Sequence, residues 1–229
     1  MKKYLSISLT ALLGVAIFFF ILSFSIGLPI YCRFFYYLHI NALDLPEYSG
    51  YDYATIKAAY DEVLNYLTLP GFKFGAGVFK FTEEGAAHFA DCKVLFNINL
   101  VALLLSSAII ITLLILNKRK IISLARPFGY SVAFVSAISV LAIILILFGV
   151  VSINFDKAFV IFHKIFFAGK DNWTFDPRFD EIITVLPQEF FMNCAILIGA
   201  GIICLSIGTI IFQIVAKKRK KSTKNQQEN

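Results

Sequence analysis

Four long apolar stretches constrain what this chain of 229 residues can fold into. They cover residues 1–30, 94–116, 128–152 and 190–215, and each contains few or no charged residues. A helix of about 20 predominantly apolar residues crosses the hydrocarbon core of a bilayer, so every stretch is long enough to span it. A hydrophobic content of 59% and a mean hydropathy of +0.77 also exclude an ordinary soluble domain. The sequence therefore predicts a mainly α-helical membrane protein with four transmembrane helices.

The first apolar stretch is predicted to be an uncleaved anchor. It is longer than the apolar core of a secretory signal peptide, and residues 24–29 lack a small-residue cleavage site. We therefore expect it to form the first transmembrane helix.

The distribution of Lys and Arg predicts the orientation in the membrane. Twelve of the 21 Lys and Arg residues lie at the N-terminal end, in the 117–127 connection or in the 216–229 tail, where Glu228 is the only acid. By the positive-inside rule, we expect these parts, and both termini, to be cytoplasmic. The connections 31–93 and 153–189 are then extracytoplasmic segments. The basic tail is interpreted as a topology signal beside anionic membrane lipid, so no nucleic-acid partner is expected, and the oligomeric state is not predicted.

The first extracytoplasmic segment is predicted to form a cap over the membrane. Apolar residues recur at helical spacing over Tyr53–Leu67, which predicts an amphipathic helix closed by Pro70 and Gly71. Phe72-Lys73-Phe74 and Phe79-Lys80-Phe81 alternate on either side of Gly75-Ala76-Gly77. This pattern predicts a short β-hairpin with an aromatic face.

A helix carrying ionisable side chains is predicted to follow the hairpin. Thr82 is a good N-cap residue, and the helix that it begins is expected to run without a break into the span at 94–116. His88, Asp91 and Cys92 are spaced so that they lie on one face of this helix. Such groups beside a membrane indicate a functional site.

The second extracytoplasmic segment brings another histidine to the same side. Phenylalanines form a broad stripe over residues 156–168, which predicts an interfacial helix with His163 in the stripe, in a packing or a functional role. Trp173 is expected to be an interfacial anchor. His39 has no acid at helical spacing except the distant Asp44, so we interpret it as an ordinary interface residue.

The residue patterns narrow the chemistry. The sequence lacks a Gly-x-Ser-x-Gly elbow, a phosphate-binding glycine loop and a His-Glu-x-x-His metal helix. His88 oriented by Asp91, together with His163, favours general acid–base catalysis. The same three side chains could alternatively bind a metal ion as two imidazoles and a carboxylate.

The four cysteines do not form a zinc or disulfide pattern. Cys32, Cys92, Cys194 and Cys204 are scattered, and the last two fall inside an apolar span. We expect them to behave as small hydrophobic residues. A disulfide between Cys32 and Cys92 stays open at this point.

Several short motifs, taken together and in order, resemble the lipoprotein intramolecular transacylase family of Gram-positive bacteria. They are His88-Phe89-Ala90-Asp91-Cys92-Lys93, Phe162-His163-Lys164-Ile165-Phe166-Phe167, Asn172-Trp173, Asp176-Pro177 and Pro187-Gln188-Glu189-Phe190-Phe191. The resemblance covers most of the chain, including all four predicted spans.

The resemblance implies a reaction and a set of site residues. The enzyme would move the sn-2 acyl chain of a diacylated lipoprotein in the outer leaflet onto the α-amino group of the lipoprotein's N-terminal Cys, giving the lyso form without a cofactor. It would be a multi-pass protein of the bacterial plasma membrane with an extracytoplasmic active site. The implied catalytic residues are His88 and His163. The implied supporting residues are Asp91, Lys93, Asn172, Trp173 and Asp176.

Three questions stay open from the sequence. Either histidine could remove the proton from the amine, and Lys93 could stabilise an oxyanion or extend to lipid headgroups. Two other functions also remain possible, a metal-dependent membrane lipid hydrolase and a non-enzymatic four-span scaffold. A hydrolase would release free fatty acid, whereas a scaffold would tolerate loss of either histidine.

Overall fold

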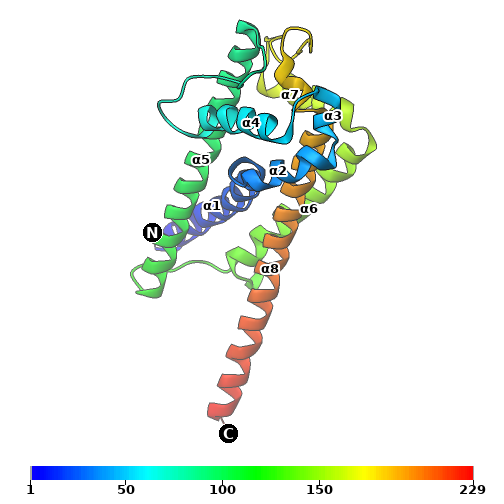
Figure 1. The fold of residues 1–229 in the computed structure, drawn as a ribbon. Helices are drawn as coiled ribbons and strands as arrows, with labels where there is room; N and C mark the ends of the chain where they lie inside the picture. Colours follow the sequence, from blue (N-terminus) through cyan, green and yellow to red (C-terminus); the bar gives the residue numbers. More distant parts are fainter. Residues whose placement is uncertain (1, 229) are drawn as a thin grey trace. The chain divides into compact units, whose positions relative to one another are not determined.

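The computed structural model describes residues 2–228, and all regular structure in that range is helical. Figure 1 shows the chain as a ribbon in which α1, α5, α6 and α8 are the long helices. In chain order the elements are α1 (Lys2–Tyr31), α2 (Arg33–Ala42), α3 (Leu45–Ser49), α4 (Tyr53–Thr68), α5 (Glu83–Lys118), the 3₁₀ helix η1 (Pro127–Gly129), α6 (Val132–Ile153), α7 (Phe155–Phe166), the 3₁₀ helix η2 (Glu181–Thr184) and α8 (Gln188–Glu228).

The prediction of four membrane spans is confirmed. The helices that are long and apolar enough to cross a membrane cover Lys3–Tyr31, Glu83–Lys118, Val132–Gly149 and Gln188–Arg219. Their side chains are mostly exposed because lipid, rather than protein, solvates much of a transmembrane helix. The predicted tail 216–229 continues α8, and residue 229 lies outside the described residues.

The described chain groups into two compact units. One unit contains the residues up to Ser25, Val101–Gly149 and the residues from Gly199 onward. Its helices meet at side chains such as Leu13, Ala137 and Ile202, all of which are buried. The other unit contains Ile26–Leu100 and Val150–Ile198, and it holds all three histidines.

The histidine-containing unit is built around the predicted amphipathic helix, which the structure confirms as α4. The apolar face of α4 is buried, and its Tyr60 ring stacks on Tyr36 of α2 with 3.7 Å between the ring centroids. The Tyr36 hydroxyl donates a hydrogen bond of 2.7 Å to the carbonyl oxygen of Val185. Phe190, at the start of α8, packs edge-on against Tyr36. Aromatic packing thus joins the two connecting segments in one core.

The predicted β-hairpin is wrong, because residues 69–82 form an irregular loop without strands. The loop packs on α4 instead of pairing with itself. The amide of Gly77 donates to Glu62 Oε2 at 2.8 Å, and Gly77 has φ +61°, a conformation that favours glycine. Ala76 and Phe79 are buried in the same core. The alternating aromatic residues therefore serve packing against a helix.

α5 begins where the sequence predicts and continues without a break into the second span. The Thr82 hydroxyl accepts a hydrogen bond of 2.9 Å from the amide of Gly85, as an N-cap residue does. Thr82 in turn donates to Asp180 through its amide at 2.8 Å and its hydroxyl at 2.9 Å. Asp180 is only 5% exposed, and a Cβ added at Gly85 would overlap its carboxylate. The second connecting segment therefore holds the first turn of α5.

A second contact next to Asp180 strengthens this attachment. The amide of Glu181 donates to the carbonyl oxygen of Lys80 at 2.9 Å, and their side chains form an ion pair at 3.1 Å. The ion pair is partly exposed and contributes little to the free energy of unfolding. Loss of the partners of the buried Asp180 carboxylate would lower that free energy by more.

We predict that Asp180→Ala lowers the free energy of unfolding by about 1–3 kcal/mol, since it leaves the Thr82 donors unpaired. Thermal unfolding in detergent micelles measures the change. Thr82→Ala should be destabilising as well, and the double variant should lose less than the sum because both changes remove one interaction. Asp171→Ala, an exposed acid in the same segment, is the matched control. Additive effects of the two changes would contradict the link.

Candidate active site

His88 lies in the second turn of α5 and is almost fully enclosed. Its side chain is 5% exposed, and its ring packs against Phe167 and Phe175 at centroid distances of 4.7 Å and 5.4 Å. Nε2 lies 3.4 Å from the Cys92 sulfur, one turn further along the helix. Nδ1 is buried and has no hydrogen-bond partner among the described residues. A buried ring nitrogen without a partner is suited to form a hydrogen bond with a bound ligand.

His163 lies near the end of α7 and is 7% exposed. Its Nδ1 donates a hydrogen bond of 2.8 Å to the carbonyl oxygen of Phe159, because a carbonyl oxygen can only accept. The proton of the neutral ring is therefore on Nδ1, and Nε2 keeps a free lone pair. Trp173 covers the ring at a centroid distance of 4.9 Å and an interplanar angle of 31°. Burial lowers the pKa of His163, while the hydrogen bond to Phe159 acts in the opposite direction.

The two imidazoles face each other although 75 residues separate them in sequence. Their centroids are 5.8 Å apart and their planes are inclined by 28°. Phe167 contacts both rings, at 4.7 Å from His88 and 5.6 Å from His163. The structure therefore brings the two predicted catalytic residues together in an aromatic enclosure.

Asp91 has partners other than those predicted. Its carboxylate accepts hydrogen bonds from Lys170 Nζ and from Asn172 Nδ2, the latter at 3.1 Å. It makes no hydrogen bond to His88, whose Nδ1 has no partner in the part of the chain that the structure describes. Asp91 thus attaches the loop after α7 (residues 167–179, the covering loop) to the helix that carries His88. The same loop carries Trp173, so this attachment determines how His163 is covered.

Two other predicted supporting residues, Lys93 and Asp176, have partners other than the two histidines. Lys93 places its ammonium group over the Tyr66 ring of α4, 4.2 Å from the centroid. Asp176 pairs with the neighbouring Arg178, which lowers the pKa of Asp176 to about 2. The carbonyl oxygen of Asp176 also accepts from the amide of Asp180 at 2.8 Å, which forms the turn leading to that residue. Asn172 and Trp173 belong to the covering loop described above.

Sequence reasoning missed two residues at the site, Lys170 and Phe175, which contact Asp91 and His88 respectively. They have no helical or strand periodicity, so only the fold reveals that they approach α5. The sequence pattern includes Cys92, on the helix face of His88, and Phe167, in the phenylalanine stripe, but it does not predict their contacts with His88.

Two alternatives from the sequence gain no support from the geometry. Among residues 2–228 no group of three or more His, Cys, Asp or Glu side chains could hold a metal ion. Cys32 and Cys92 are both free thiols, so the disulfide left open above is not formed. His39 lies against Phe35 and Phe190 and donates from Nδ1 to the carbonyl oxygen of Phe35.

Comparison with known proteins identifies the family. The family model of the lipoprotein intramolecular transacylase Lit matches residues 11–191. This chain belongs to the Lit family. It is accordingly a lipoprotein intramolecular transacylase, an acyltransferase that is integral to the membrane with several spans. No curated protein matches the chain.

Solved structures agree with this assignment. The chain is similar to the lipoprotein intramolecular transacylase Lit of Bacillus cereus, with a TM-score of 0.85 and 26% identity over 96% of this chain and 100% of that chain. Two further structures of the Bacillus cereus protein, each with a histidine replaced, match with TM-scores of 0.81 and 25% identity. They cover 97% and 96% of this chain and 96% and 97% of theirs.

We predict that Asp91→Ala loosens the covering loop, because Lys170 and Asn172 lose their common acceptor. Trp173 is the only tryptophan, so its fluorescence reports on this loop. Emission should shift to longer wavelength, and acrylamide quenching should increase about twofold or more. Asp61→Ala is the matched control, since Asp61 also binds two basic side chains, Arg33 and Lys57, but not the loop. Equal quenching in the wild type and Asp91→Ala would contradict the prediction.

Proposed function

We propose that this enzyme moves the sn-2 acyl chain of a diacylglyceryl-modified lipoprotein to the α-amino group of that lipoprotein's N-terminal cysteine. The C–N bond of an amide forms, the C–O bond of the ester breaks, and the product is a lyso-form lipoprotein. The amine gives up one proton and the departing glyceryl oxygen gains one, so no cofactor is consumed.

The facing pair of His88 and His163 is the observation that carries this proposal. The two rings come from different helices, lie 5.8 Å apart and are enclosed by aromatic side chains. Proton transfer by positioned imidazoles contributes typically about 10²–10⁴-fold to a rate. Two rings within one enclosure allow one proton to be taken up and one to be returned in the same reaction.

We assign the base to His163. Its neutral form carries the proton on Nδ1, which leaves Nε2 free to accept one from the attacking amine. The proton that His163 takes up then passes to His88, which faces the protonated ring. Burial lowers the pKa of His88 to about 4, so His88 gives this proton to the glyceryl oxygen as the ester breaks, and both rings return to the neutral form. Its buried Nδ1, which has no partner among the described residues, is the atom we assign to the substrate.

The reaction needs no nucleophile from the enzyme. The amine and the ester belong to one substrate molecule, and tethering gives a well-oriented pair a very high effective concentration. This agrees with a sequence that has no Gly-x-Ser-x-Gly elbow. The Cys92 thiol beside His88 has no step in this scheme.

The supporting residues act through the enclosure in this proposal. Asp91 anchors the covering loop through Lys170 and Asn172, and Trp173 limits the movement of the His163 ring. Asp176 shapes the turn that presents Asp180. The contact of Lys93 with Tyr66 supports a role in holding α5 against α4, and we assign Lys93 no chemical step.

We place this site on the extracytoplasmic side of the plasma membrane, with both termini cytoplasmic. The support is the concentration of Lys and Arg at the opposite ends of the spans. A diacylated lipoprotein in the outer leaflet would then present its ester at the depth of the lipid headgroups, with membrane lipid surrounding the enclosure.

Replacing either His88 or His163 by Ala should reduce formation of the lyso product at least about 10²-fold, because each change removes a proton-transfer group. Mass spectrometry of N-terminal lipopeptides from cells that make only diacylated lipoproteins measures the product. His39→Ala is the matched control and should retain activity, since His39 lies in the aromatic core away from the pair. Unchanged product in either catalytic variant would overturn the dyad, whereas free fatty acid in place of the lyso form would indicate a hydrolase.

The pH dependence of the reaction should follow the substrate amine. An ordinary α-amino group has a pKa of about 7.7–8.0, and only its neutral form attacks. The pKa of His163 is lowered from 6.5, so the ring stays neutral and able to accept a proton as the pH falls from 8 through 6.5. The rate should therefore decrease roughly tenfold per pH unit below the amine pKa, with no second decrease above about pH 6.5.

A second lipopeptide with a less basic α-amine shows whether the titrating group belongs to the substrate or to the enzyme. With this lipopeptide, the decrease in rate on the acid side of the pH–rate profile should move to lower pH by the difference between the two amine pKa values. The measurement uses initial rates in proteoliposomes at saturating substrate. If the rate decreases at the same pH with both substrates, the titrating group belongs to the enzyme and the prediction is contradicted.

A further inference from the structure

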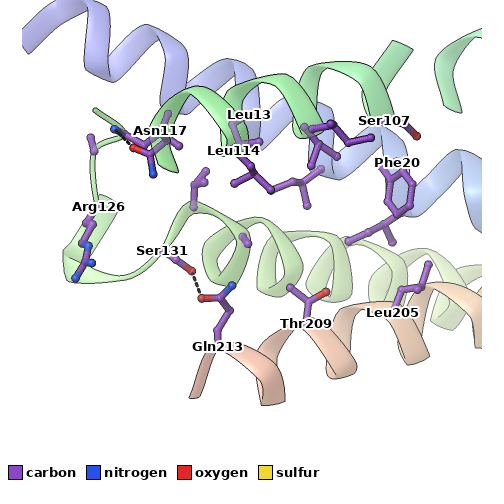
Figure 2. Close-up of a pocket in the computed structure, with 18 residues that line it drawn as sticks. Leu13, Phe20, Ser107, Leu114, Asn117, Arg126, Ser131, Leu205, Thr209 and Gln213 are labelled. Carbon is purple, nitrogen blue, oxygen red and sulfur yellow. Dashed lines mark hydrogen bonds between the residues drawn. The ribbon is translucent and has the colours of Figure 1, made fainter. Parts of the chain in front are cut away.

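The unit formed by α1, α5, α6 and α8 contains an apolar cavity that has no part in the acyl-transfer scheme. Its volume is about 580 Å³, within the range of ligand pockets, which is about 300–1,000 Å³. Aliphatic and aromatic side chains from all four helices line it, including Leu13, Phe20, Leu114 and Leu205. Figure 2 shows these side chains between the helices. A cavity with so few polar atoms does not hold water well, so an apolar chain is the occupant that fits.

One end of this cavity is polar and basic. Figure 2 shows Arg126, Asn117 and Ser131 together at that end, while Phe20, Ser107 and Leu205 lie at the other. No Asp or Glu is among the lining residues. The Arg126 side chain is exposed and makes no hydrogen bond or ion pair with any residue in the described range.

The loop that presents Arg126 is fixed by buried contacts. The amide of Ala125, next to Arg126, donates to Thr10 Oγ1 at 2.7 Å, and Thr10 is only 6% exposed. The amide of Leu124 donates to Asn117 Oδ1 at 3.3 Å. At the start of α6, Ser131 donates to Gln213 Oε1 of α8 at 2.9 Å. The guanidinium is thus carried by backbone whose position the helices determine.

An amphiphile with a long apolar chain and an anionic head matches these two ends. The planar guanidinium of Arg is suited to bind a phosphate with two parallel hydrogen bonds. Arg119 and Lys120 follow α5, which adds positive charge near the loop. Basic pockets between transmembrane helices are known to bind acidic phospholipid headgroups.

We propose that this cavity is a binding site for one anionic glycerophospholipid of the leaflet that contacts the 117–127 loop. An acyl chain fills the cavity, and the phosphate binds to Arg126. The lipid is a bound constituent of the bundle and not a substrate, and its binding is independent of the histidine chemistry.

The test measures lipid retention by the full-length protein. Wild type and variants are equilibrated in nanodiscs with equal amounts of phosphatidylglycerol and phosphatidylcholine, extracted into mild detergent and analysed by native mass spectrometry. The wild type should retain one phosphatidylglycerol in preference to phosphatidylcholine. Arg126→Gln should bind it at least about tenfold more weakly, because a charge-assisted hydrogen-bond pair is lost.

Two further variants distinguish binding of the lipid headgroup from binding of its acyl chain. Lys118→Gln removes the same charge from an exposed residue that does not line the cavity, so retention should not change. Ala133→Leu, inside the cavity, should also weaken retention by occupying space for the chain. Equal retention by the wild type and Arg126→Gln, an equal loss in Lys118→Gln, or no preference for phosphatidylglycerol would each overturn the proposal.

Discussion

The histidine site depends on one buried interaction, the binding of Thr82 by the Asp180 carboxylate. α5 carries His88, and the segment that follows α7 carries Asp180 and the covering loop. A helix start buried without partners for its amides would be costly, and here the Thr82 hydroxyl accepts from the Gly85 amide. The Asp180 carboxylate, almost 100 residues away in sequence, in turn accepts from the amide and hydroxyl of Thr82. One carboxylate therefore holds the cap residue of α5 and joins the two segments that supply the imidazoles. A side chain at position 85 would overlap that carboxylate, so glycine fits this position.

Much of this architecture is readable from the sequence. The apolar runs predict the four spans, and the periodicity of Tyr53–Leu67 predicts α4. Thr82 followed by acidic residues marks the start of α5 correctly. Each of these features depends on local physics, namely the length of an apolar run, the 3.6-residue repeat or a cap. The sequence predicts less directly that His88 and His163 share one site. That prediction rests on the orientation of the spans, which places both on the same side of the membrane, and on the resemblance of short motifs to a family.

The errors arise where a residue's partner is distant in sequence. Phe72-Lys73-Phe74 and Phe79-Lys80-Phe81 alternate as strands do, but Glu62 of α4 binds the Gly77 amide between them, and the loop packs on the helix. Asp91 is at the correct spacing to meet His88, but Lys170 and Asn172 offer charge-assisted and geometrically better partners. Neither competitor is visible from local sequence, since both belong to other elements. Local patterns predict which groups are available to interact but do not determine which pairs form.

The enclosure also bears on why an acyl transferase of this kind makes an amide rather than a free acid. Both imidazoles are at most 7% exposed, and aromatic rings from the covering loop pack against them. Exclusion of water from a site suppresses hydrolysis of a reactive ester, whereas a tethered amine stays next to its carbonyl when water is removed. Burial further keeps His163 neutral, which is the form that accepts a proton. The covering loop, attached through Asp91, would thus keep His163 able to accept a proton and would favour the amine over water as the nucleophile. Opening the loop would weaken both effects.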